Sequence, residues 1–156
     1  MRRQDETIRL FQNYRRLNAL TKEVSFPLPK TTDVLDMMIM HQPSWFTLID
    51  MWSSFSQIKM HQYSIDKTSF VTPRGSYKCT VMPPGLTGSP ATLQRLITGV
   101  LEGLLFENVL TYIDEILIFG KSYSEHLQDI EKVFNRLRDA NLKLHPPRCV
   151  DELYKK

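Results

Sequence analysis

Acidic residues interrupt two apolar stretches of the chain, TYIDEILIF at residues 111–119 and WFTLID at residues 45–50. Asp114 and Glu115 lie in the first stretch, and Asp50 ends the second. Burying a carboxylate costs free energy unless the group is paired, hydrogen-bonded or bound to a metal. If the stretches are neighbouring strands, three carboxylates meet at one end of a sheet, where a cation such as Mg²⁺ would offset their repulsion. Such an ion also binds phosphate oxygens, so the spacing is compatible with phosphoryl transfer. The alternative is that Asp114 and Glu115 are ordinary exposed turn residues.

The elements that would position these acids are mostly strands. Residues 45–50 are aromatic and β-branched, as expected of a buried strand. Residues 109–119 are predicted to form two short strands with the acids at or near the bend between them. Residues 68–82 contain two further strand-like runs joined by a Pro-Arg-Gly turn, which indicates a hairpin.

A long amphipathic helix is predicted to follow Ser89-Pro90, which have the preferred order of N-cap and first-turn proline. Its apolar residues recur at three and four positions as far as Leu105. Gly99 and Gly103 fall inside this pattern. They either let another backbone approach closely or only weaken the helix.

Two other segments are predicted to be helical. Residues 32–40 form a short helix, and a longer amphipathic helix follows Ser122, with Glu125 three residues on as in a capping box. Strands and helices therefore occur in a mixed order without regular alternation. This order predicts an α+β domain with an antiparallel sheet.

The composition is that of a globular chain. It has 156 residues, 42% of them hydrophobic, and a net charge of +3. Cys79 and Cys149 are far apart and lack the spacing of a zinc site, which disfavours a disulfide framework as well. We find no apolar leader and no run as long as a membrane span, so the chain is expected to be intracellular with no membrane partner.

Positive charge is concentrated near the N-terminus. Residues 1–18 contain five arginines and two acids. Such a segment either contacts phosphate groups or is a solvated charged surface.

Several segments, taken together, resemble the reverse transcriptase of Gypsy-type LTR retrotransposons. The segments that carry the resemblance are NYRRLNALTKEVSFPLP, FTLIDMWSSFSQI, DKTSFVTPRGSYKCTVMPPG, VMPPGLTGSPATLQRL, TYIDEILIF and EHLQDIEKVFNRLRDANLKLHPPRC, in the family's order and spacing. The resemblance runs from about Arg9 to Cys149. It implies a right-hand polymerase fold of fingers and palm, in which an antiparallel palm sheet packs on helices.

The resemblance also implies the roles of the acids. Asp114 matches the first metal-binding aspartate of the family's hairpin, and Asp50 matches the aspartate of the neighbouring strand. Glu115 stands at the second hairpin acid. The implied cofactor is Mg²⁺ or Mn²⁺. The implied partners are deoxynucleoside triphosphates and a primer on an RNA or DNA template.

Other positions match residues that contact the substrates. On the nucleotide side the resemblance implies a triphosphate contact for Arg9, a ring that excludes the ribose 2′-hydroxyl at Phe55, and a loop at Pro84 and Gly85. On the primer and template side it implies Tyr112 near the primer end and Gln94 near the template. For Gln94, a polar surface residue is an equally good interpretation.

The chain departs from the family pattern at five positions. Glu115 replaces an aspartate, Asn13 replaces an aspartate, Pro84 replaces a phenylalanine and Ser54 replaces a glycine. Arg148 stands near the position where similar enzymes carry a lysine proposed to protonate the leaving pyrophosphate, and an arginine does not readily give up a proton. One added methylene at Glu115 displaces the carboxylate by about 1 Å, enough to lower a rate by about 10²-fold.

The implied domain boundaries are fingers at residues 1–25 and 58–88 and palm at residues 26–57 and 89–156. The family's primer-grip hairpin and thumb have no match in VDELYKK at residues 150–156, so the thumb is expected to be absent. Three functions stay open: an impaired RNA-directed DNA polymerase, an inactive descendant that keeps the fold and nucleic-acid binding, and a structural α+β domain.

Overall fold

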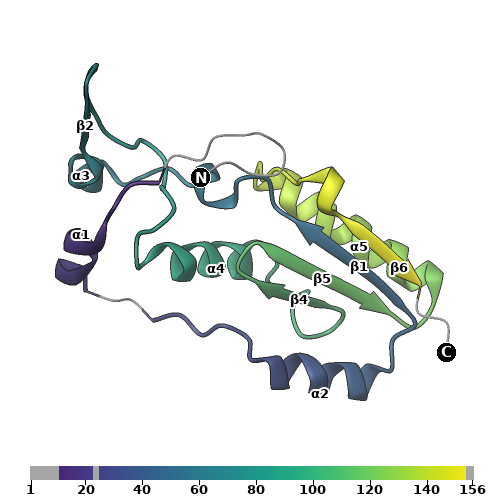
Figure 1. The fold of residues 1–156 in the computed structure, drawn as a ribbon. Helices are drawn as coiled ribbons and strands as arrows, with labels where there is room; N and C mark the ends of the chain where they lie inside the picture. Colours follow the sequence, from purple (N-terminus) through teal and green to yellow (C-terminus); the bar gives the residue numbers. More distant parts are fainter. Residues whose placement is uncertain (1–10, 23–24, 154–156) are drawn as a thin grey trace. The chain divides into compact units, whose positions relative to one another are not determined.

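The computed structural model describes residues 11–22 and 25–153 (Figure 1). The chain forms two compact units. One unit contains residues 1–24 and 55–89, and the other contains residues 25–54 and 90–156.

The unit of residues 25–54 and 90–156 is built on a four-stranded antiparallel sheet. Its strands are β1 (Trp45–Asp50), β4 (Val109–Tyr112), β5 (Glu115–Gly120) and β6 (Val150–Leu153), in the order β4-β5-β1-β6. The strands predicted at residues 45–50 and within 109–119 are confirmed, as is the α+β class. The sequence did not predict β6, which pairs with the outer edge of β1.

Two helices cover one face of this sheet. α5 (Tyr123–Asp139) packs on β5 and β1, and α4 (Ser89–Val100) is hydrogen-bonded to β4. The predicted N-cap of α5 is confirmed, since the Ser122 side chain accepts a hydrogen bond from Glu125 N–H. The core between sheet and helices is fully buried and consists of Ile49, Ile116, Ile118, Leu93, Ile97, Leu101, Val133 and Leu137.

The opposite face of the sheet is partly covered by α2 (Thr31–His41), which matches the short helix predicted at residues 32–40. The His41 ring meets Phe119 edge-on, with ring centroids 5.5 Å apart. Between Val34 and Leu48 a cavity of about 320 Å³ remains, and it is lined mainly by apolar side chains of β1, β4 and β5.

The predicted extension to Leu105 of the helix that follows Ser89-Pro90 is wrong. α4 ends at Val100, and the chain turns through Gly103 at a φ of 83°, a conformation that favours glycine. A Cβ at Gly99 or Gly103 would have no atom within 4 Å, so neither glycine permits a close backbone approach. The apolar periodicity continues past the helix because Leu101, which follows it, is also fully buried.

The unit of residues 1–24 and 55–89 contains short elements. They are α1 (Arg15–Leu20), α3 (Gln62–Ile65), the 3₁₀ turn η2 (Asp66–Thr68) and the hairpin of β2 (Phe70–Thr72) and β3 (Gly75–Tyr77). The hairpin predicted within residues 68–82 is confirmed, with shorter strands. Two more 3₁₀ turns, η1 (Ser54–Gln57) and η3 (Pro146–Arg148), follow β1 and precede β6 along the chain.

Across the described part of the chain, we find no helix that combines the length and apolar character needed to cross a membrane.

Candidate active site

Strand register brings the three acids to one end of the four-stranded sheet. Asp50, the last residue of β1, is paired with Glu115, the first residue of β5. Asp114 precedes Glu115 in the turn from β4, and its carbonyl accepts a hydrogen bond of 3.1 Å from Met51 N–H. The neighbouring strands that the sequence suggested are therefore present.

The three carboxylates nevertheless have different surroundings. The Asp114 carboxylate accepts a hydrogen bond of 3.3 Å from the Ser54 hydroxyl. The Asp50 side chain is 18% exposed, and its Oδ2 lies 3.5 Å from Nη1 of Arg148. Glu115 is exposed and lines the apolar cavity. Within residues 11–22 and 25–153, no group of three or more His, Cys, Asp or Glu side chains is arranged to hold a metal.

The two aspartates still provide a donor set that suits a hard divalent cation. Mg²⁺ is commonly held by one or two carboxylates together with substrate phosphates. Asp50 and Asp114 are half-buried at the ends of adjacent strands, and each is held by a backbone contact. In the case of Asp50 this contact is the hydrogen bond of 2.8 Å from His145 N–H to its carbonyl.

The turn that carries Asp114 has a strained backbone. Ile113 lies at a φ of 57°, in the left-handed region. A β-branched residue is disfavoured there, because its Cβ approaches the following carbonyl oxygen. Such a conformation persists only where surrounding contacts impose it.

Gln94 of α4 supplies those contacts. Its side chain is 2% exposed, and its Oε1 accepts a hydrogen bond of 2.7 Å from Ile113 N–H. Its Nε2 donates to the Thr111 hydroxyl at 2.9 Å and to the Thr111 carbonyl at 3.3 Å. The interpretation of Gln94 as a polar surface residue is therefore wrong. The helical period could have shown this, since Gln94 is spaced three and seven residues from the buried Ile97 and Leu101.

Tyr112, which the resemblance places near the primer end, is 52% exposed. It precedes the strained turn and is paired with Glu115 across the β4–β5 hairpin.

The residues expected on the nucleotide side are distributed over the unit of residues 1–24 and 55–89. Arg9 lies outside the described residues. Phe55 is half-buried in η1, where its carbonyl accepts a hydrogen bond of 3.1 Å from Ile58 N–H. Pro84 is half-buried, and Gly85 is exposed at a φ of 98°. This φ explains the choice of glycine in the Pro84-Gly85 loop.

The Pro84-Gly85 loop is held by Asn18, a residue that we did not single out from the sequence. Asn18 Nδ2 donates to the Gly85 carbonyl at 2.9 Å, and its Oδ1 accepts from Thr87 N–H at 3.0 Å. An open cavity of about 410 Å³ beside this loop is also lined by Gln12 and Tyr14. Burial, with a smaller contribution from Cys79, raises the pKa of the Tyr14 hydroxyl well above its usual range.

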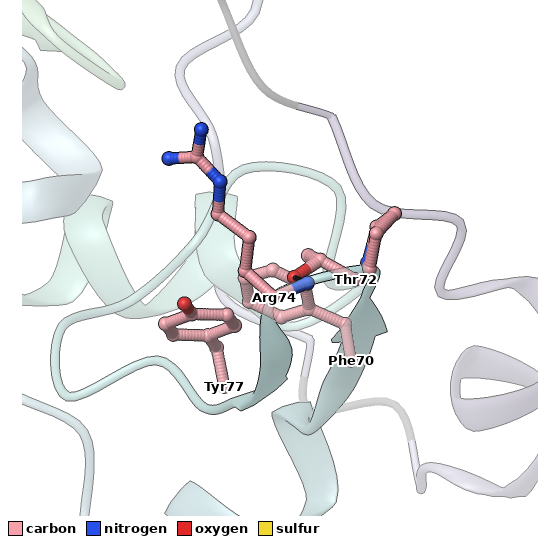
Figure 2. Close-up of a pocket in the computed structure, with 5 residues that line it drawn as sticks. Phe70, Thr72, Arg74 and Tyr77 are labelled. Carbon is pink, nitrogen blue, oxygen red and sulfur yellow. Dashed lines mark hydrogen bonds between the residues drawn. The ribbon is translucent and has the colours of Figure 1, made fainter.

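The β2–β3 hairpin has a second hollow, drawn in Figure 2, of about 430 Å³. Phe70 and Tyr77 stack across the hairpin with their ring centroids 5.8 Å apart. The Arg74 side chain extends away from the two rings in Figure 2, while the backbone N–H of Arg74 donates to the Thr72 hydroxyl at 3.2 Å. These contacts are explained by the hairpin turn and by cross-strand packing.

Comparison with known families shows which family this chain belongs to. The sequence profile described as Reverse transcriptase (RNA-dependent DNA polymerase) matches residues 2–153. The chain belongs to the reverse transcriptase family. The similarity to this family that the sequence motifs suggested is thereby confirmed.

The curated relatives of this family member are retrotransposon polyproteins. The chain is 42% identical to the retrovirus-related Pol polyprotein from transposon 297 of Drosophila melanogaster, over 90% of the chain and 13% of that protein. It is 31% identical to the transposon Tf2-3 polyprotein of Schizosaccharomyces pombe, over 94% of the chain and 11% of that protein. The chain thus spans a small part of the polyproteins it matches.

Solved structures with the same fold include reverse transcriptases of foamy virus. The native prototype foamy virus protease-reverse transcriptase matches with a TM-score of 0.81 and 23% identity, over 98% of this chain and 20% of that one. The foamy viral protease-reverse transcriptase in complex with RNA/DNA hybrid matches with a TM-score of 0.76 and 21% identity, over 88% of this chain and 18% of that one. These likenesses establish the fold, with helices and antiparallel sheets as in the fingers and palm.

Proposed function

We propose that this chain is the catalytic part of a Gypsy-type RNA-directed DNA polymerase and extends a primer with deoxynucleotides. The unit of residues 25–54 and 90–156 would be the palm, and the unit of residues 1–24 and 55–89 the fingers. One observation carries the proposal: in a member of the reverse transcriptase family, strand register places Asp50 opposite Glu115, with Asp114 in the adjoining turn.

The reaction would be an in-line phosphoryl transfer. The primer 3′-hydroxyl loses its proton to solvent, and its oxygen forms a bond to the α-phosphorus of a deoxynucleoside triphosphate. The bond from that phosphorus to the bridging oxygen breaks, so that pyrophosphate leaves. Asp50 and Asp114 would hold Mg²⁺, which when bound stabilises charge on the attacking and leaving oxygens. The Ser54 hydroxyl keeps the Asp114 carboxylate oriented through its hydrogen bond.

We assign the nucleotide and primer contacts by family position. Arg9 would contact the triphosphate, Phe55 would exclude the ribose 2′-hydroxyl, and the Pro84-Gly85 loop would lie beside the nucleotide. Tyr112 is available to the primer end, since half of its side chain is exposed.

By family position, Arg148 would lie on the leaving-group side. Its guanidinium, 3.5 Å from Asp50, contributes positive charge there. Because a guanidinium keeps its proton, it would act by electrostatic attraction and not as a general acid.

Primer extension on an RNA template tests the proposal, with Mg²⁺ and separately with Mn²⁺. The natural chain would be compared with Asp114→Asn and with Asp36→Asn, which makes the same chemical change at an exposed position of α2. We expect extension by the natural chain and by Asp36→Asn and none by Asp114→Asn. Extension that survives Asp114→Asn in a clean preparation would contradict the metal assignment.

The second candidate is an inactive descendant that still binds nucleic acid. It is favoured by Glu115, whose side chain is exposed over the apolar cavity and which the resemblance places at an aspartate position. This candidate predicts salt-sensitive binding of an RNA/DNA hybrid without extension, because phosphate contacts release counterions. Extension that appears only in Glu115→Asp would show that the added methylene disabled the site.

A further inference from the structure

The turn of the hairpin that carries Asp114 has a backbone conformation that its own residues disfavour. It passes through Ile113 at a φ of 57°, where a β-branched side chain is disfavoured. Left to local preference, this turn would relax toward an allowed conformation, and the residue after it would move as well. A contact from outside the hairpin must therefore impose the turn.

We propose that Gln94 is a positioning residue for Asp114, because its buried side chain clamps the strained turn. The carboxamide spans the hairpin backbone from the Thr111 carbonyl to the Ile113 N–H, with hydrogen bonds of 3.3 Å and 2.7 Å. The consequence for catalysis depends on the polymerase function proposed above, whereas the clamp itself does not.

The chemistry of the clamp requires a carboxamide. Ile113 N–H offers a donor and needs an acceptor, while the Thr111 carbonyl is an acceptor and needs a donor. A glutamine side chain supplies both at its end, and the Thr111 hydroxyl at 2.9 Å gives its Nε2 a second partner. Because Gln94 is 2% exposed, water cannot readily replace these bonds when the side chain is removed.

The clamp acts on one side of Asp114, and the end of β1 acts on the other. Met51 N–H donates to the Asp114 carbonyl at 3.1 Å, and the Ser54 hydroxyl donates to its carboxylate at 3.3 Å. Asp114 is thus fixed between α4 and β1. A displacement of about 1 Å at a reacting group lowers a rate by about 10²-fold, so release of the turn would reach the chemistry.

Amide hydrogen exchange, followed by NMR in the metal-free chain, tests the clamp without any activity. We expect Gln94→Met to accelerate exchange at Ile113, whose N–H donates to Gln94, and at Glu115 by about tenfold or more, while Ile118 and Leu137 in the core stay protected. The matched control is Asn18→Leu, which removes the other loop-bridging carboxamide and should leave the hairpin amides unchanged. If Gln94→Met does not fold, Gln94→Asn, which is one methylene too short to span both partners, takes its place. Unchanged exchange at Ile113 and Glu115 in a folded Gln94 variant would overturn the proposal.

Steady-state kinetics then test the catalytic consequence. We expect Gln94→Met to lower kcat for nucleotide incorporation by about 10²-fold with little change in KM. Adding Ile113→Gly should restore part of that loss, because a glycine turn needs no clamp. Equal losses with and without Ile113→Gly would contradict a positioning role. If the natural chain shows no extension, the proposed function fails, and the exchange experiment still decides whether the clamp exists.

Discussion

Each unit of the chain contains a loop that is bridged by a side-chain carboxamide, and the two bridges have the same pattern. Asn18 spans the Gly85 carbonyl and the N–H two residues later. Gln94 spans the Thr111 carbonyl and the N–H two residues later, at Ile113. In both cases an amide side chain makes one donor and one acceptor contact with a bend in the backbone.

The two bridges differ in burial and in the residue at the bend. Asn18 is half-buried, and the bend beside it has Gly85, which adopts a positive φ without strain. Gln94 is fully buried, and the bend beside it has Ile113, a β-branched residue that is strained at its positive φ. The loop with glycine at its bend is bridged at a site where water can replace the carboxamide. The loop with isoleucine at its bend is bridged at a site that water cannot reach. Burial of the clamp therefore indicates how much the loop depends on it.

The two bridges should differ most in their effect on the free energy of unfolding when each carboxamide is converted into a carboxylate. Gln94→Glu places an ionisable group in the core against the Thr111 carbonyl, and we expect it to lower the free energy of unfolding at pH 7 by more than about 2 kcal/mol. Asn18→Asp, at a half-exposed site, should cost less than about 1 kcal/mol. Urea unfolding of both variants measures the difference.

The pH dependence sharpens this test. Burial should raise the pKa of the new carboxyl in the folded state of Gln94→Glu above its unfolded value, so the penalty grows as pH rises between the two values. We therefore expect the variant to recover stability, relative to the natural chain, when the pH falls from 7 toward 5. A penalty that does not change with pH would mean that the new side chain reaches water.

Substitutions at the two bends, Gly85 and Ile113, should change the free energy of unfolding by a smaller amount. Gly85→Ala forces a Cβ into a positive φ, and we expect a loss of about 1 kcal/mol, since the new Cβ would meet Tyr14 at an ordinary 3.7 Å. Ile113→Gly relieves backbone strain while it removes a half-buried side chain, so the two effects should cancel to within about 1 kcal/mol. Thermal or urea unfolding compares the two. A loss of several kcal/mol in Ile113→Gly would show that side-chain packing governs that bend.

The smallest effects are expected for the ion pairs of the two units. Lys78 and Asp66 lie 2.7 Å apart but are 56% and 81% exposed, so Lys78→Gln should change stability by less than about 0.5 kcal/mol. Arg148→Gln should cost up to about 1 kcal/mol, because its partner Asp50 is only 18% exposed. Unfolding at low and high salt checks both values, and salt should reduce each of them. A larger loss of stability in Lys78→Gln than in Arg148→Gln would contradict this prediction.

The sequence determined the local elements of this protein and its family. The strand at residues 45–50, the acid-bearing hairpin within 109–119 and the capped start of α5 at Ser122 were all predicted. These features depend on residue types and periods within a few positions of one another, which a single sequence displays directly. The family motifs likewise lie along the chain in a fixed order.

Only the tertiary structure decided which distant groups meet. Gln94 contacts residues 17 and 19 positions away, and Asn18 contacts residues 67 and 69 positions away. The pairing of β6 with β1 and the approach of Arg148 to Asp50 join segments still farther apart. Such contacts depend on how elements pack and on which side chains are buried together, and no local pattern encodes that. The acids could be found by reading the chain, whereas the contact of Gln94 with the turn before Asp114 required the fold.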